Sequence, residues 1–108
     1  MKRGDIVLVV LQGEFGKPRP GVIVQADELD ASSSTIVCPM SSHIDAANGI
    51  RPVVAPTVQN GLLVRTQIMT DKLNTLRHDR VKRIIGTLDS DACQRLNSAL
   101  LLVLGLAR

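Results

Sequence analysis

Aromatic side chains are almost missing from this 108-residue sequence. Phe15 is the only one, and the chain has no Trp and no Tyr. We therefore expect a core built from Val, Ile, Leu, Ala and Met. Proteins that bind single-stranded nucleic acid commonly stack bases on aromatic rings. If this chain binds RNA, it must do so mainly through arginine, hydrogen bonds and shape.

Cysteine and histidine are also scarce. Cys38, Cys93, His43 and His78 are scattered without the spacing of metal ligands, so we expect no metal and no other cofactor. No secretory signal precedes the first predicted strand, which favours reduced core thiols in a cytoplasmic protein. The apolar run at 100–106 is too short to cross a bilayer, so no membrane partner is expected.

The charge is mildly basic, with 13 Lys and Arg against 10 Asp and Glu, a formal net charge of +3. That excess permits a polyanionic partner without requiring one. Cations outnumber acids between residues 65 and 83, which a solvated face explains about as well as nucleic acid does. The length predicts one domain, residues 1–108.

Short apolar runs rich in branched residues dominate the first two-thirds of the chain. They predict strands at 6–11, 22–25, 35–40, 51–55, 62–64 and 81–88, with 67–70 a strand or a helical turn. Pro39 is expected to end the third strand, and Asn60-Gly61 to form a turn before the fifth. Closely spaced strands followed by one helix predict an α+β domain on a small curled antiparallel sheet.

The last element has the clearest helical pattern. Asp89 is a good N-cap, and apolar residues follow with helical spacing at Cys93, Leu96, Leu100, Val103 and Leu104. Leu101, Leu102 and Leu106 are apolar as well, so the apolar stripe is wider than one small core needs. We therefore expect a homodimer that buries this excess.

The segment 13–25 combines turn residues with charged groups between two apolar runs. It predicts a β-hairpin with an enlarged loop, in which Pro18 and Pro20 keep residues 17–20 outside regular strand pairing. Arg19 is expected close to Glu14 and Lys17. A carboxylate and a restrained guanidinium on one loop suit the handling of a phosphate.

Three segments carry a family resemblance: Lys2-Arg3-Gly4-Asp5-Ile6-Val7, Arg19-Pro20-Gly21-Val22-Ile23-Val24-Gln25 and Gln67-Ile68-Met69-Thr70. In this order, with Thr35-Ile36-Val37 and a final helix from Asp89, they resemble the MazF/PemK toxins. These are small bacterial endoribonucleases of type II toxin–antitoxin pairs. The resemblance runs from residue 2 to about residue 104. It implies an SH3-like antiparallel β-barrel of the MazF and CcdB type with a C-terminal helix, usually a homodimer.

RNA can be cut without metal because its own 2′-hydroxyl can attack the adjacent phosphate. The resemblance places the catalytic arginine at Arg19 and a catalytic hydroxyl at Ser41, where the family has Thr or Ser after the matching strand. Ser42 is adjacent, so which hydroxyl faces the site stays open. Glu14 has the family's spacing before Arg19, although the family's Ser between Gly and Glu is missing. It acts as a base, orients Arg19 or is a plain loop carboxylate.

Further residues are candidates for RNA binding: Lys17, Ser42, His43, Gln67 and Thr70. Gln67 and Thr70 belong to the third matching segment and have either structural or RNA-contacting roles. The family has an acid where this chain has Thr66 and a cation where it has Met69, and about five extra residues follow near 73–78. These departures leave the cleavage sequence undetermined. His78 lies among charged residues, and exposure explains it better than catalysis.

The sequence thus predicts a metal-independent, sequence-specific endoribonuclease toxin that cleaves single-stranded mRNA and inhibits growth. Its expected partners are RNA, a second copy of the chain and a cognate antitoxin whose disordered acidic tail covers the same surface. One alternative is a CcdB-like gyrase poison, although that branch acts through a helix ending in an aromatic residue and this chain ends Leu106-Ala107-Arg108. The other is a catalytically impaired paralogue that only binds an antitoxin.

Overall fold

The computed structural model describes residues 1–11, 13, 16–29, 33–45 and 49–107. Its strands are β1 (Asp5–Val10), β2 (Pro18–Ile23), β3 (Ser34–Ser41), β4 (Val53–Val54), β5 (Thr66–Ile68), β6 (Asn74–Arg77) and β7 (Val81–Thr87). Three short 3₁₀ turns, η1 (Asp27–Leu29), η2 (Thr70–Lys72) and η3 (His78–Arg80), connect them, and the helix α1 (Ser90–Val103) follows.

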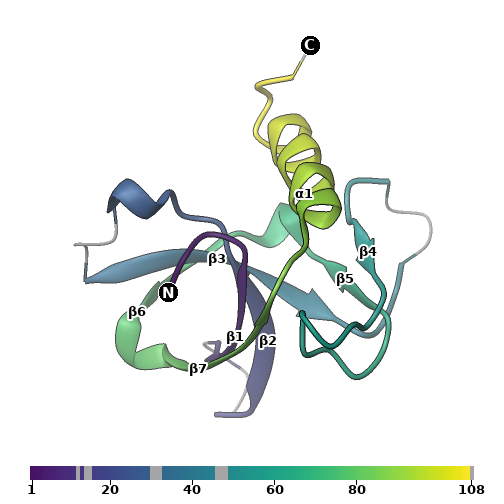
Figure 1. Cartoon of the computed structure of the whole chain (residues 1–108). Helices are drawn as coiled ribbons and strands as arrows, with labels where there is room; N and C mark the ends of the chain where they lie inside the picture. The colour runs from purple at the N-terminus through teal and green to yellow at the C-terminus, as the bar shows by residue number, and fades with distance from the viewer. Residues whose placement is uncertain (12, 14–15, 30–32, 46–48, 108) are drawn as a thin grey trace.

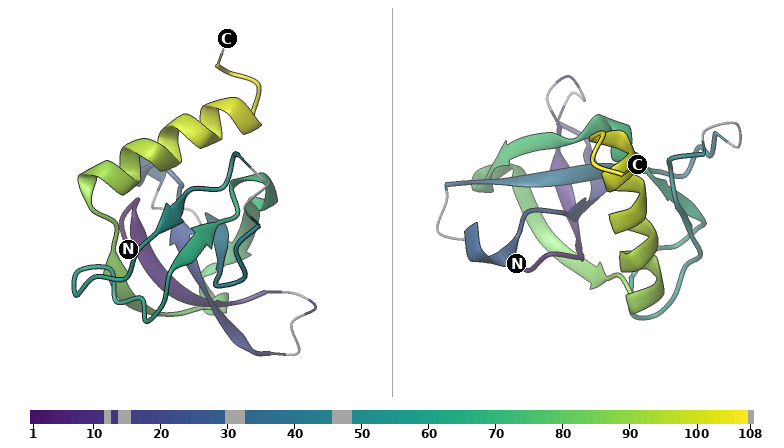
Figure 2. Two further views of the ribbon diagram at one scale, coloured as in Figure 1. Left: turned by 90° about the vertical axis from the view of Figure 1, so that its right-hand side faces the viewer. Right: turned by 90° about the horizontal axis from the view of Figure 1, so that it is seen from above.

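The strands form one antiparallel sheet in the order β4-β5-β3-β2-β1-β7, with β6 paired to β3. Figure 1 shows this sheet curling on itself, with α1 lying over one side of it, and Figure 2 shows the same arrangement from two further directions. The α+β class and the curled antiparallel sheet expected from the sequence are confirmed.

The expectation that residues 17–20 lie outside regular pairing is wrong for residues 18–20. β2 begins at Pro18, and Pro18, Arg19 and Pro20 lie opposite Val10, Val9 and Leu8 of β1. The two prolines are two residues apart, so their nitrogens face the same edge of the strand. β3 pairs with β2 only from Gly21 onward, so an edge without a partner strand accepts residues that have no N–H to donate.

Other boundaries also differ from the sequence-based expectation. β3 continues through Pro39, which lies opposite Gly21, and ends at Ser41. Residues 62–64 are irregular, and the fifth strand is Thr66–Ile68 instead. The strand β6 was not expected, because the residues around it have little apolar character. Pairing with β3 decides its conformation.

The helix begins where the sequence indicates. The Asp89 side chain accepts a hydrogen bond from the backbone N–H of Ala92 at 2.8 Å, the expected N-cap contact. Leu96 and Leu100 are buried against the sheet, in an aliphatic cluster with Ile6, Val22 and Cys38. A second cluster covers the other face of the sheet and consists of Val7, Val9, Ile23, Val37 and Leu76.

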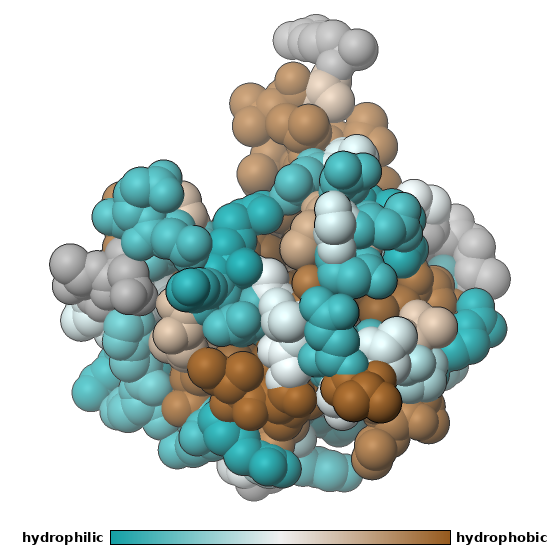
Figure 3. Space-filling view, in the orientation of Figure 1, coloured by the Kyte–Doolittle hydropathy of each residue, from teal (hydrophilic) through white to brown (hydrophobic). Residues whose placement is uncertain are grey.

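The C-terminal part of α1 and the residues after it carry exposed leucines. Leu101, Leu102, Leu104 and Leu106 are between 46% and 68% exposed. Figure 3 shows the resulting apolar surface above the rest of the molecule. The apolar excess read from the sequence is therefore present on the surface of the single chain. Within the described residues, no helix has the length and apolar character needed to span a membrane.

Candidate active site

Arg19 lies on β2, near the end of the sheet where β2 extends beyond its pairing with β3. Its position opposite Val9 fixes its backbone in the sheet, and its side chain is exposed. The flanking prolines further restrict the backbone. A guanidinium held on a strand in this way is well placed to make two parallel hydrogen bonds to a phosphate.

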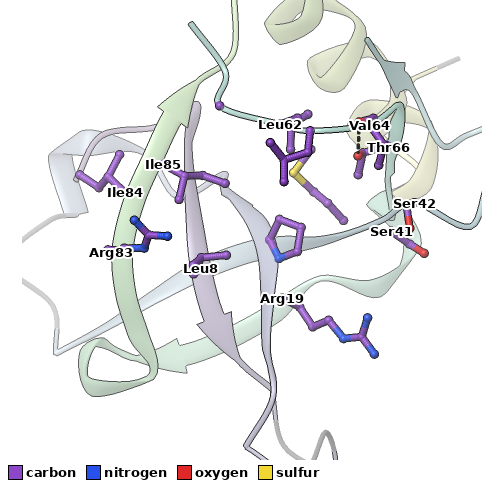
Figure 4. A pocket seen from close by; sticks show the side chains of 14 residues that line it. Leu8, Arg19, Ser41, Ser42, Leu62, Val64, Thr66, Arg83, Ile84 and Ile85 are labelled. Atoms are coloured by element: carbon purple, nitrogen blue, oxygen red, sulfur yellow. Dashed lines mark hydrogen bonds between the residues drawn. The ribbon is translucent and has the colours of Figure 1, made fainter. Parts of the chain in front are cut away.

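A groove of about 580 Å³ runs beside Arg19. β2 and β1 contribute Arg19, Pro20 and Leu8. The end of β3 contributes Met40 and Ser41, and Ser42 follows directly after the strand. Its other walls are residues of the irregular segment before and into β5, and of β7: Gly61, Leu62, Leu63, Val64, Thr66, Arg83, Ile84 and Ile85. Figure 4 shows these side chains around the groove, with the Arg19 guanidinium extending toward the side on which Ser41 lies.

A smaller hollow of about 180 Å³ joins the two principal candidates. It is lined by Arg19 and Ser41 together with Leu11, Pro39, Met40 and Met69. Arg19 and Ser41 line both hollows, whereas Ser42 lines only the larger one. The structure thus brings together the arginine and the hydroxyl that the sequence singled out, although 22 positions separate them in the chain.

The Ser41 hydroxyl takes part in a local hydrogen bond at the end of β3. Its Oγ accepts from the backbone N–H of His43 at 3.1 Å, and Ser41 is half-buried at the last position of β3. Since this bond uses Oγ as an acceptor, the hydroxyl hydrogen remains available to a phosphate oxygen. Ser42 is exposed, as is the side chain of His43.

With this geometry in place, comparison with known proteins decides the family. The family model described as PemK-like, MazF-like toxin of type II toxin–antitoxin systems matches residues 2–104. This chain belongs to that family.

A curated relative named probable endoribonuclease MazF, from Mycolicibacterium smegmatis, is 35% identical over 108 residues, covering 99% of each chain. A solved endoribonuclease in complex with its cognate antitoxin, from a mycobacterial species, matches with a TM-score of 0.84 at 17% identity, over 100% of this chain and 98% of that one. MazE–MazF from Deinococcus radiodurans matches with a TM-score of 0.78 at 16% identity, over 99% and 97%. These structures confirm the MazF-type fold.

Two of the residues in the family's third segment are buried in this chain. Gln67 is 2% exposed, and its Oε1 accepts from the Asp45 backbone N–H at 3.1 Å. Thr70 is fully buried, and its hydroxyl donates to the carbonyl oxygen of Ile50. These bonds favour the structural role among the two that the sequence left open. Because Gln67 lies opposite Ser41 in the β3–β5 pair, it supports the strand end that carries the hydroxyl.

Two of the departures from the family pattern, Thr66 and Met69, lie at the candidate site. Thr66 is buried in the groove wall, and its hydroxyl donates to the Val64 carbonyl oxygen at 2.9 Å. Met69 lines the smaller hollow beside Arg19 and Ser41. Both places therefore carry an uncharged side chain where the family has a charged one.

The remaining candidates lie apart from the two hollows or outside the described residues. Lys17 is exposed just before β2 and lines neither hollow. His78 lies in η3, where its backbone N–H donates to the Ser33 carbonyl oxygen. Glu14 falls outside the described residues, so its role stays a prediction. Among the residues that the structure describes, no group of three or more His, Cys, Asp or Glu side chains could hold a metal ion.

The sequence analysis missed the wall made by residues 61–64 and β7. This wall depends on close backbone packing, since a Cβ on Gly61 would lie 2.0 Å from the Ile85 carbonyl oxygen and Gly61 has φ +70°. The Asn60 side chain locks the turn by accepting from Thr57 and Leu62 and donating to Ala55. The Asn60-Gly61 pair marked a turn, but nothing local showed that the turn would dock on Ile85 of β7, 24 positions after Gly61.

Proposed function

We propose that this MazF-like toxin endoribonuclease of a toxin–antitoxin system cleaves single-stranded RNA at a specific sequence, by attack of the 2′-hydroxyl on the adjacent phosphate. The products are a 2′,3′-cyclic phosphate, or the 3′-phosphate formed from it, and a 5′-hydroxyl. The observation that carries this proposal is the shared placement of Arg19 and Ser41 around one hollow. Cleavage of cellular mRNA would inhibit growth.

Arg19 and Ser41 have separate roles in this proposal. As the 2′-oxygen attacks, negative charge builds on the non-bridging phosphate oxygens, and the Arg19 fork stabilises it through two charge-assisted hydrogen bonds. Arginine stays protonated in proteins, so we assign it charge stabilisation and no proton transfer. The Ser41 hydroxyl donates to the same phosphate. Glu14 remains the predicted base or the group that orients Arg19, and a base in that place typically contributes about 10²–10⁴-fold.

The groove supports a polyanionic ligand. Among its described lining residues, Arg19 and Arg83 are the charged groups, and none is an acid. The same charge suits an acidic segment of an antitoxin, which we propose as the inhibitor at this surface. The exposed leucines at the end of α1 support a homodimer, since a second copy would bury them.

Cleavage of a long, weakly structured RNA in the presence of EDTA tests the proposal. We expect cuts at one short recurring sequence, with 5′-hydroxyl ends. EDTA should not prevent them, because the sequence lacks the spacing of metal ligands and the described residues include no group of three or more that could hold a metal ion. Activity that is abolished by EDTA and restored by Mg²⁺ or Zn²⁺ would contradict the mechanism. An intact RNA together with tight antitoxin binding would favour the impaired paralogue, and inhibition of gyrase would favour the gyrase poison.

The salt dependence of RNA binding provides a second test. With so few aromatic side chains, affinity should come from phosphate contacts, each giving a slope of about −0.7 in log K against log salt for single strands. A slope near zero, with most affinity lost in Phe15→Ala, would show that base stacking dominates instead.

A further inference from the structure

The strand β7 is irregular where it borders the groove. Ile6 lies opposite Gly86 and Val7 opposite Ile84, so Ile85 is an extra residue in β7. Leu8 lies opposite Arg83 and Val9 opposite Val81, so Lys82 is a second extra residue. Two register shifts therefore flank Arg83 and Ile84 within one seven-residue strand. Such bulges are over-represented next to active sites, where they redirect side chains.

The register shifts lie where β7 borders the groove. Arg83, Ile84 and Ile85 all contribute to this wall. Figure 4 shows the Ile84 and Ile85 side chains on opposite sides of the strand, as expected for neighbouring residues. Gly86 holds this arrangement in place, because a Cβ there would lie 2.3 Å from the Asn60 backbone.

Arg83 is placed across the sheet from Pro20, the residue that follows the candidate catalytic arginine. Leu8 lies opposite Pro20 on one side and opposite Arg83 on the other, so these three residues form one row across β2, β1 and β7. Neighbouring strands are about 4.8 Å apart, which puts the Arg83 backbone roughly 10 Å from that of Pro20, the residue after Arg19. Figure 4 shows Arg83 and Arg19 at different points along the groove.

The surroundings of Arg83 favour an anionic ligand. Several other arginines already contact protein groups: Arg51 with Asp71 at 2.8 Å, Arg95 with Asp91 at 3.1 Å and Arg77 with Asp79 at 3.2 Å. Among the described residues, no hydrogen bond or ion pair satisfies the Arg83 guanidinium. Its groove neighbours Leu8 and Ile84 are apolar and supply no competing acceptor.

We propose that Arg83 binds a second phosphate of the RNA, one that is not cleaved, and so fixes the register of the strand relative to Arg19 and Ser41. This inference rests on the proposed function, since it concerns the same groove and the same substrate. Arg83 is a positioning residue for the reacting phosphate. It anchors the chain in the ground state and the transition state alike, so its loss should weaken binding and leave the chemical step nearly intact.

The experiment compares wild type, Arg83→Gln and the matched control Arg80→Gln, in which the same charge is removed from an exposed arginine that lines neither hollow. For Arg83→Gln we expect KM for RNA to rise about tenfold, with kcat within about threefold of wild type. Binding of a 2′-O-methyl RNA, which cannot be cleaved, should lose about 0.7 from its salt slope. Arg80→Gln should match wild type in all three measurements.

Substituted RNA locates the contact without relying on a protein variant alone. Each phosphate around a mapped cut site is replaced in turn by a neutral methylphosphonate. One position other than the cleaved phosphate should weaken wild-type binding about tenfold and should have no further effect in Arg83→Gln. The inference would be overturned if the loss of affinity from Arg83→Gln multiplied with the loss from the methylphosphonate at every position. It would also be overturned if Arg80→Gln weakened binding as much as Arg83→Gln.

The outcomes separate this inference from the proposed function. Normal cleavage by wild type together with unchanged KM in Arg83→Gln would reject the role of Arg83 and leave the function intact. No cleavage by wild type, but 2′-O-methyl RNA binding that depends on Arg83, would reject the function and support the phosphate contact. If wild type does not cleave RNA, and 2′-O-methyl RNA either does not bind or binds equally well to Arg83→Gln, both the function and the role of Arg83 are rejected.

Discussion

The groove beside Arg19 and the hollow at the end of α1 differ in size and in the polar groups that line them. The groove encloses about 580 Å³ and combines two arginines and two serines with aliphatic side chains. The hollow at the end of α1 encloses about 400 Å³, and we call it the helix-end surface. Its lining is mainly apolar: Arg3, Val24, Ile36, Leu73, Asn97, Leu100, Leu101, Leu104 and Leu106.

The difference suits two different kinds of partner. The Nε of Arg3 donates to the Val24 carbonyl oxygen at 2.9 Å, so the cation at the helix-end surface already has a partner within the fold. A surface of this kind gains most from burial against another protein, because exposed apolar area is removed from water. The groove instead presents guanidinium groups and hydroxyls, which suit phosphate groups.

The largest expected effect is that of removing the Arg19 guanidinium, to which we assign the stabilisation of charge in the groove. Arg19→Ala should lower the single-turnover cleavage rate by about 10²–10³-fold, the usual cost of deleting one key donor to a developing oxyanion. Arg19→Lys should recover RNA binding but little of the rate, because lysine lacks the planar fork. Thermal unfolding should be unchanged in both variants, since the side chain is exposed. Near-normal cleavage by Arg19→Ala would remove this residue from the site.

The helix-end surface is tested by placing a charge in it. If a second copy covers these leucines, Leu101→Glu should weaken the dimer by about 10²-fold, because an unpaired carboxylate would be buried. Leu63→Glu is the matched control, since Leu63 is 93% exposed and lines the groove instead. Sedimentation at micromolar concentration measures the dimer. A wild-type protein that sediments only as an 11.6 kDa species would contradict the prediction.

Substitution of Ser41 and of Ser42 tests which of the two hydroxyls acts in the groove. Ser41→Ala should lower the cleavage rate about tenfold, because one hydrogen bond to a charged phosphate is lost. Ser42→Ala should have a smaller effect, since Ser42 does not line the hollow that Arg19 and Ser41 share. Single-turnover rates at saturating protein compare the two directly. The reverse order would assign the functional hydroxyl to Ser42.

The smallest expected effect is on the pH dependence of stability, and it comes from the two thiols in β3 and α1. Burial raises the pKa of Cys38 in β3 to about 12, against the opposing effect of Arg3, and burial also raises the pKa of Cys93 in α1. A thiol whose pKa is higher in the folded state stabilises the fold below its unfolded pKa of 9.0, and this contribution is lost as the pH rises toward the folded value.

The free energy of unfolding should therefore fall by about 1 kcal/mol between about pH 9 and 10 because of Cys38. Urea unfolding of wild type, Cys38→Ala and Cys93→Ala at both pH values measures this change. Cys38→Ala should show the shallowest dependence on pH. The same dependence in all three proteins would mean that the Cys38 thiol ionises as readily in the folded state as in the unfolded one.

Local signals were sufficient for some elements and insufficient for others. The helix was predicted from its N-cap and its apolar spacing, because both depend on residues within the helix itself. The paired prolines of β2 were misread, since whether proline fits a strand depends on which edge has a neighbour. The strand β6 was missed because its partner, β3, lies about 40 positions earlier in the sequence.

The sequence by itself determined the α+β class, the C-terminal helix with its excess of leucine, and the candidate pair Arg19 and Ser41. The class and the helix follow from periodicity and capping, and the candidate pair follows from the resemblance to the MazF/PemK toxins that the order of the motifs carries. Only the tertiary structure decided that Gln67 and Thr70 are buried, that residues 61–64 form a wall of the groove, and that Arg83 lies in it. The physical reason is that burial, docking of glycines and strand register depend on partners distant in sequence, which local patterns do not encode.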